Sequence, residues 1–209
     1  MKKSVALFLA VFITIFAAFS GSDDPRTDDD YAARFLAADG NERALFALRD
    51  GISRDLETRP GDTRLLNNRL TVNRRLNDIA ATGEDIRLLA EYNPESPLLL
   101  LQHCLFVEGT NPDQAVPLQC YRDVVVLFRK KTAADLPLNP DYVLTMLLAQ
   151  LPEAGPVCER FTREAESSLA TVLGKKLCAG FNRQLLFNGE LDTLFTDEDW
   201  AQHLPGAPG

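Results

Sequence analysis

The sequence has few of the side chains that most often carry catalysis. Only two histidines occur among its 209 residues, His103 and His203. The motifs G-x-S-x-G and H-E-x-x-H are absent, as are a phosphate-binding loop, a dinucleotide-binding glycine pattern and a calcium-binding loop. His103 lies within an apolar stretch, where a hydrogen-bonded core residue is expected rather than a general base. The sequence therefore predicts a non-catalytic protein that needs no cofactor.

Cysteine is also scarce, and its spacing does not match a zinc site. Structural zinc sites commonly use closely spaced cysteine pairs, and no C-x-x-C occurs here. We therefore predict no metal site. An even number of cysteines in an exported chain favours disulfide bonds instead. The four residues are Cys104, Cys120, Cys158 and Cys178.

Helix geometry favours one of the three ways to pair these cysteines. A 104–120 bond joins residues at similar heights in a helical hairpin if the second helix begins at Pro117. A 158–178 bond requires a helix break near Ser168, where serine is a suitable cap for a new helix. The apolar pattern runs through this point without interruption. The pattern therefore indicates one continuous helix, whereas the cross-link requires two. We predict the 104–120 and 158–178 pairs, with the break.

Basic residues are in the minority. The chain has 22 lysines and arginines against 30 aspartates and glutamates, a net charge of −8. The arginines at 54, 59, 64, 69 and 74 recur every five residues. On a helix this step turns each one about 140° from the last, so they form no stripe. We expect no binding of nucleic acid. The acidity favours a protein partner with a basic surface, although solubility alone also explains it.

The one long apolar run lies at the N-terminus. Two lysines precede the run Val5–Phe19, in which Thr14 is the single polar residue, and small residues follow it. As a helix the run would span about 22 Å, short of the roughly 30 Å hydrocarbon core of a membrane. We predict that residues 1–20 are a cleaved signal peptide, with an uncleaved anchor as the alternative.

Both alternatives place the rest of the chain outside the cytoplasm. We predict a periplasmic protein, with secretion or N-terminal anchoring as alternatives, and no stable membrane insertion after cleavage. Removing residues 1–20 takes two lysines from the 22 basic residues, which leaves 20 against 30 and a net charge of −10. The predicted parts are an acidic linker at 21–26, a single all-helical domain at 27–203 and a disordered tail at 204–209.

No stretch shows the period of two that a half-buried strand requires. Helical periodicity, with proline and glycine stops, instead predicts helices joined by short loops. The predicted fold class is all-α, either an irregular helical bundle or a short stack of helical hairpins like tetratricopeptide arrays, stapled by two disulfides. The expected helices cover 27–38, 41–57, 62–83, 84–92, 97–108, 117–131, 140–151 and 157–188, and Asn41, Asp62 and Asn139 open three of them.

The stretch Leu98–Val107 is the most apolar part of the predicted domain. Eight of its ten residues are apolar. Ser96 and Pro97 form a helix start, and Gly109 is expected to end the helix. A helix that is apolar on nearly all sides must be covered by other helices. Other residues expected on apolar helix faces are Tyr31, Phe35, Leu36, Leu45, Leu48, Ile52 and Leu56.

An acidic and aromatic segment near the C-terminus is the predicted binding site. It could dock a basic partner or fold back on the domain. Asp192, Asp197 and Asp199 in the same segment leave paired-acid cleavage of a glycan as an alternative. A second candidate surface is the polar stretch 64–78, whose asparagines and arginines are expected on an exposed face. The binding residues predicted in the C-terminal segment are Leu191, Leu194, Phe195, Asp197, Glu198, Asp199 and Trp200.

Together these features predict an exported, non-catalytic protein that binds another protein. Its size, acidity, export and lack of catalytic motifs resemble in kind the bacterial periplasmic immunity proteins that neutralise secreted toxins, although no motif carries the resemblance. The preferred function is a periplasmic immunity or inhibitor protein. The alternatives are a tetratricopeptide-like scaffold or envelope-assembly factor and, less favoured, a small helical glycan hydrolase.

Overall fold

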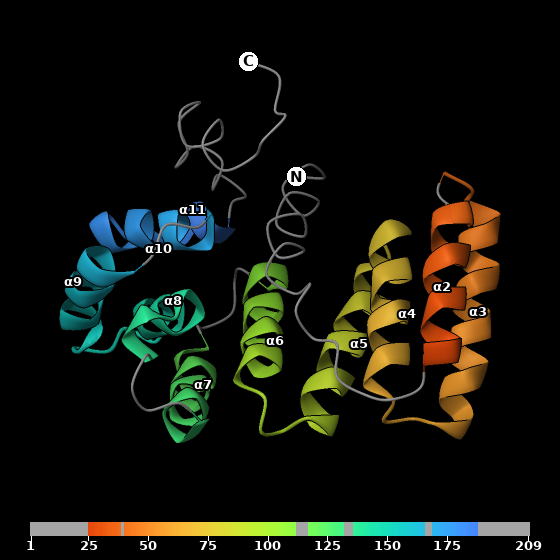
Figure 1. Ribbon diagram of the computed structural model, residues 1–209, viewed down its shortest axis with the longest axis horizontal. Helices are drawn as coiled ribbons and strands as arrows, with labels where there is room; N and C mark the ends of the chain where they lie inside the picture. The colour runs from red at the N-terminus through yellow and green to blue at the C-terminus, as the bar shows by residue number, and fades with distance from the viewer. Residues whose placement is uncertain (1–24, 39, 112–116, 132–135, 166–168, 188–209) are drawn as a thin grey trace, which may run out of the picture. The chain divides into compact units, whose positions relative to one another are not determined.

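The described part of the chain is helical throughout. The computed structural model describes residues 25–38, 40–111, 117–131, 136–165 and 169–187, and within them all regular structure is α-helix or 3-10 helix. The prediction of an all-α fold is confirmed; the tetratricopeptide-like detail is not confirmed. The predicted signal peptide and the predicted tail lie outside the described residues (Figure 1).

The chain divides into two compact units. Among the described residues, the N-terminal unit lies between 25 and 107, and the C-terminal unit lies between 108 and 187. A compact unit is not the same as an independently folding domain, so the predicted single domain at 27–203 stays a prediction. The N-terminal unit contains α2 (Pro25–Ala38), α3 (Glu42–Thr58), α4 (Thr63–Arg75), α5 (Ile79–Tyr92) and most of α6 (Pro97–Thr110).

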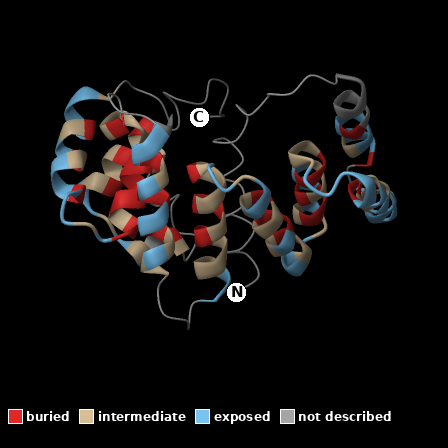
Figure 2. Cartoon of the chain, turned by 90° about the horizontal axis from the view of Figure 1, so that it is seen from below, coloured by how far each residue is buried: buried red, intermediate tan, exposed pale blue. Residues whose placement is uncertain are grey.

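Helices of the N-terminal unit pack against their neighbours in sequence. Contacts join α2 to α3, α3 to α4 and α4 to α5 (Figure 1). Phe106 of α6 packs on the core of this unit. Figure 2 shows that the helices carry both buried and exposed residues. The predicted stripe of α3, Leu45, Leu48, Ile52 and Leu56, is buried as expected.

Capping side chains set where these helices begin. The Asn41 side chain accepts a hydrogen bond from the backbone N–H of Ala44, and Asp62 accepts from those of Arg64 and Leu65. Both side chains satisfy N–H groups that have no partner within the helix. The predicted helix starts at Asn41 and Asp62 are confirmed.

The predicted boundary at Gly83 is wrong. Helix α4 ends at Arg75, and α5 begins at Ile79 with Asp78 as its cap. Asn77 has a φ of 55°, a left-handed conformation that ends a helix and that asparagine adopts more readily than most residues. Gly83 lies inside α5, where an added Cβ would be 2.5 Å from a ring carbon of Phe106. This glycine therefore serves helix packing, not a turn.

Helix α6 matches its prediction at the start and in its burial. It begins at Pro97, with the Ser96 hydroxyl 3.5 Å from the backbone nitrogen of Leu99. Every residue from Ser96 to Gly109 is buried or half-buried, as the apolar composition predicted. The predicted stop is wrong, because Gly109 is helical and α6 continues to Thr110. Leu36, expected on an apolar face of α2, is 75% exposed, so that expectation is also wrong.

The C-terminal unit packs around one short, apolar helix. Helix α8 contacts α7, α9, α10 and η1, and six of its nine residues are buried. Asn139 caps α8 and Pro140 is its first residue, as predicted. It ends at Leu148, before the predicted 151, and Gln150 follows with a φ of 53°. The elements are α7 (Leu118–Lys131), η1 (Leu136–Leu138), α8 (Pro140–Leu148), α9 (Ala154–Glu164), α10 (Leu169–Ala179) and α11 (Arg183–Phe187).

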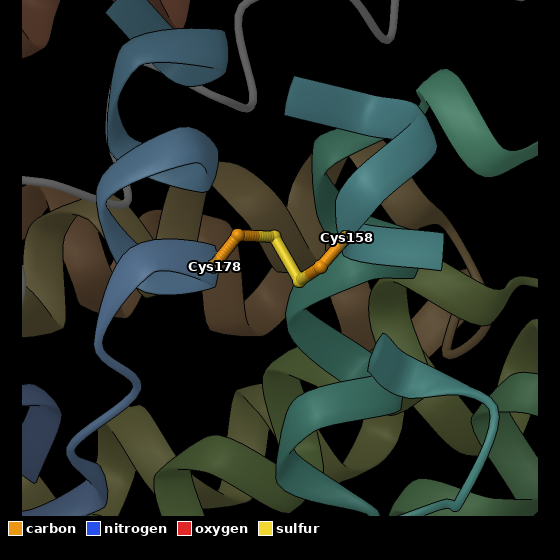
Figure 3. Close-up of a disulfide and its surroundings, with 2 residues drawn as sticks. All are labelled: Cys158 and Cys178. Atoms are coloured by element: carbon orange, nitrogen blue, oxygen red, sulfur yellow. A yellow bond between two sulfur atoms is a disulfide. The ribbon is translucent and has the colours of Figure 1, made fainter. Parts of the chain in front are cut away.

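The predicted 158–178 disulfide and the helix break that it requires are both confirmed. The two sulfurs are 2.02 Å apart and the Cα atoms 5.3 Å apart (Figure 3). Helix α9 ends at Glu164, Ala165 is extended with a ψ of 134°, and α10 begins at Leu169. The apolar pattern is continuous here because both helices of the hairpin face one core. The helix was also predicted to continue without a break to residue 188. This is wrong, since α10 ends at Ala179 and α11 begins at Arg183.

The other two cysteines are disulfide-bonded as well. Cys104 and Cys120 are both in this state, and no cysteine of the chain is free. The predicted pairing of these two residues with each other stays a prediction. Helix α7 begins at Leu118, one residue after the predicted Pro117.

Candidate protein-interaction surface

The binding segment predicted from the sequence lies outside the described residues. This applies to Leu191, Leu194, Phe195, Asp197, Glu198, Asp199 and Trp200, and to the alternative acid Asp192. These residues stay a prediction. A candidate surface among the described residues must therefore come from the side chains that the helices leave in solvent.

An exposed aromatic ring of the N-terminal unit lies against an arginine, and an exposed isoleucine follows the aspartate that pairs with this arginine. Phe46 of α3 is 39% exposed and Ile79 of α5 is 41% exposed. The guanidinium carbon of Arg49 lies 4.9 Å from the centre of the Phe46 ring. Arg49 Nη1 also lies 3.2 Å from Oδ2 of Asp78, the residue before Ile79. We call these four residues the Phe46–Ile79 surface.

The local sequence explains why this surface is ordered. Phe46 follows Leu45, the first residue of the buried stripe of α3, and so points away from the core. The Asp78 carboxylate has two roles, because Oδ1 accepts from the backbone N–H of Ala81 while Oδ2 pairs with Arg49. The helix cap of α5 thus holds the arginine beside the aromatic ring. Aromatic residues and arginine are enriched in the energetic centres of protein interfaces.

The stretch 64–78 is only partly the exposed polar face that the sequence predicted. Asp85 of α5 has a side chain 1% exposed, and it receives hydrogen bonds from Arg69 and Asn73 of α4. Arg69 Nη2 lies 2.6 Å from Asp85 Oδ1, and Asn73 Nδ2 lies 2.8 Å from Oδ2. Burial raises the pKa of the Asp85 carboxyl, and the hydrogen bonds from Arg69 oppose this shift. Arg69 and Asn73 therefore join two helices and do not form a binding surface.

His103 is half-buried on α6, as a core residue would be, but its predicted hydrogen bond is not found at Nδ1. That atom is buried and has no hydrogen-bond partner among the described residues. Burial lowers the pKa of the imidazole, and the charge of Arg87 lowers it further while Glu91 raises it. His203 lies outside the described residues.

The described residues offer neither a metal-ligand cluster nor a membrane-spanning helix. They contain no group of three or more histidine, cysteine, aspartate or glutamate side chains that could hold a metal ion. Nor do the described helices include one long and apolar enough to cross a membrane.

Comparison with known proteins adds no relative. The chain matches no family model, no curated protein and no solved structure. Any functional conclusion must therefore come from its own residues.

Proposed function

We propose that this chain is an exported, non-catalytic protein that acts by binding another protein, as an immunity or inhibitor protein for a secreted toxin or enzyme. The observation that carries the binding role is the Phe46–Ile79 surface. Large apolar side chains left in solvent beside an ordered arginine are typical of an interface centre. Arg49 has little conformational freedom left to lose on binding, because Phe46 and Asp78 already hold it.

Export is supported by the cysteines and the N-terminal sequence. All four cysteines are disulfide-bonded, and such bonds persist in oxidising compartments such as the periplasm. The first 20 residues have the basic, apolar and small-residue order of a signal peptide. The net charge of −10 without them favours a basic partner through electrostatic attraction during encounter.

A capture experiment with surface variants tests this proposal. The tagged full-length chain and its Phe46→Asp/Ile79→Asp variant are exposed to extracts that contain secreted proteins. Val126→Asp is the matched control, because Val126 is an apolar side chain of α7 that is 51% exposed. We expect the wild type and the control to retain one protein in a stoichiometric complex and to inhibit its activity. The double variant should bind it at least tenfold more weakly, since charged groups would replace the apolar contacts. Equal retention by all three chains would contradict the role of this surface.

A scaffold or envelope-assembly factor is the second candidate. It is favoured by the packing of α2, α3, α4 and α5 in sequence order, an arrangement that also builds extended helical binding surfaces. The same capture experiment separates the two candidates. Several envelope proteins retained without inhibition of any of them would support the scaffold and contradict the inhibitor.

A further inference from the structure

Arg183 is the centre of a buried cluster in the C-terminal unit. Its Nε and Nη2 atoms donate to the two carboxylate oxygens of Glu108, at 2.5 and 2.7 Å, although the residues are 75 positions apart. Its Nη1 atom donates to the backbone carbonyl of Leu148 at 2.7 Å. The guanidinium carbon lies 5.4 Å from the centre of the Tyr121 ring. The side chains of Arg183 and Glu108 are only 17% and 11% exposed.

The groups around Arg183 are selective for a guanidinium group. A carboxylate that accepts two parallel N–H bonds matches the planar fork of arginine, which lysine cannot reproduce. The hydroxyl of Tyr121 donates to Glu108 Oε2 at 2.7 Å and so holds the carboxylate in place. Burial raises the pKa of the Tyr121 phenol, so the phenol keeps its proton. Leu148 is the last residue of α8, where the free carbonyl and the helix dipole favour a cation.

The segment that carries Arg183 is a short helix that depends on its tertiary contacts. Helix α11 has five residues, little more than one turn, and a helix of this length is not stable without tertiary contacts. Residues 180–182 separate it from α10. Its other described anchors are Leu186, which is 2% exposed, and the ring of Phe187, 5.8 Å from the guanidinium carbon of Arg183.

We propose that Glu108, Tyr121 and the Leu148 carbonyl form a guanidinium-binding socket, which Arg183 fills in the free protein and which an arginine of a basic partner protein fills when α11 is displaced. An unpaired Glu108 would be a buried charge without compensation, which is costly. Exchange of α11 therefore requires another cation in its place. Only this exchange with a partner rests on the proposed function; the socket itself is a property of the described residues.

Chemical rescue tests the socket without a partner. The substitution Arg183→Ala should lower the Tm of the full-length chain by about 10 °C, because it leaves Glu108 buried and unpaired. Millimolar methylguanidinium should restore part of this loss, whereas methylammonium at the same concentration should not. An Arg183→Ala/Glu108→Gln double variant should show no rescue by either cation. If Arg183→Ala does not fold, the yield of refolding with and without methylguanidinium is the measurement. Absence of rescue, or equal rescue by methylammonium, would overturn the socket.

A peptide competition tests the exchange. A labelled peptide with the sequence of residues 180–188, GFNRQLLFN, is titrated into the full-length Arg183→Ala chain. We expect binding at least tenfold tighter than that of the same peptide with glutamine in place of arginine. The wild-type chain should bind the arginine peptide more weakly than Arg183→Ala does, because its own Arg183 competes. Equal affinity of the two peptides, or of the two chains, would overturn the exchange. If these tests succeed and the capture experiment fails, only the proposed function is overturned.

Discussion

Two glycines show how closely the helices of this protein approach one another. Gly83 of α5 faces the ring of Phe106, and Gly174 of α10 faces the ring of Phe161. In both places an added Cβ would lie less than 3.0 Å from a ring carbon. Each glycine slightly destabilises its own helix. Because glycine has no Cβ, however, an aromatic ring can pack directly against the helix backbone.

Replacing Gly174 by alanine should therefore destabilise the protein although alanine is the better helix former. The new Cβ would lie 2.6 Å from Cε1 of Phe161, a side chain that is fully buried and cannot move without disturbing its neighbours. We expect a loss of about 1–3 kcal/mol in the free energy of unfolding, measured in urea. Gly155→Ala is the matched control, because nothing lies within 4 Å of its added Cβ. A Gly174→Ala variant as stable as Gly155→Ala would contradict this packing.

Asp141 should make stability depend on pH. Burial raises its pKa from 3.8 to about 6. Between these values the folded state binds more protons than the unfolded state, so stability falls as the pH rises through this window. Asp141→Asn should then be more stable than the wild type by about 3 kcal/mol at pH 7.5 and equally stable at about pH 2.5. Urea unfolding at both pH values measures this difference. A stability difference between Asp141→Asn and the wild type that stays constant with pH would argue against the shift.

At the scale of helices, buried polar pairs fix how neighbouring helices are aligned. Apolar contacts alone would allow one helix to shift along the other. Asp85 ties α5 to α4 through Arg69 and Asn73. Arg183 ties α11 to the ends of α6 and α8. Hydrogen bonds of fixed direction define the register of two helices, whereas apolar contacts tolerate several registers.

The Asp85 cluster should be sensitive to the loss of one partner. Asp85→Ala removes the acceptor and leaves Arg69 half-buried without its carboxylate. We expect a loss of about 3 kcal/mol in the free energy of unfolding, measured by chemical denaturation. Asp50→Ala is the control, because that carboxylate is 69% exposed and 3.8 Å from Arg49. A loss of less than 1 kcal/mol for Asp85→Ala would show that the cluster does not hold the two helices together.

For the whole molecule, the described helices form two compact units with a common construction. Each is built from helices, and each has its own buried cluster of polar side chains, around Asp85 in one and around Arg183 in the other. The 158–178 disulfide lies within the C-terminal unit, where it joins α9 to α10.

Export makes a prediction about the complete chain. If residues 1–20 are a signal peptide, the exported protein should begin near residue 21 and carry a net charge of −10. Intact-mass spectrometry of the protein recovered from the periplasm checks both the N-terminus and the oxidation of all four cysteines. A product that retains Met1 would support the uncleaved anchor instead.

Local sequence signals were sufficient for much of the fold. The caps at Asn41, Asp62 and Asn139 were predictable because a side-chain oxygen satisfies N–H groups only two or three residues away. The helix break near Ser168 was predictable from the 158–178 pairing, because a disulfide between these residues cannot form along one unbroken helix. By contrast, the turn at Asn77 was missed, since Gly83 is the stronger local stop signal and its packing against Phe106 is not visible in a local pattern.

The candidate sites depended on tertiary structure. Composition and spacing determined the all-α class, the oxidised cysteines and the acidic balance, since these follow from local periodicity and residue counts. Only the folded chain decided that Arg49 lies between Phe46 and Asp78, and that Arg183 fills a site made by Glu108 and Tyr121. The physical reason is that a helix pattern assigns a polar residue to one side of its own helix. It does not identify the distant side chain that will meet the residue there.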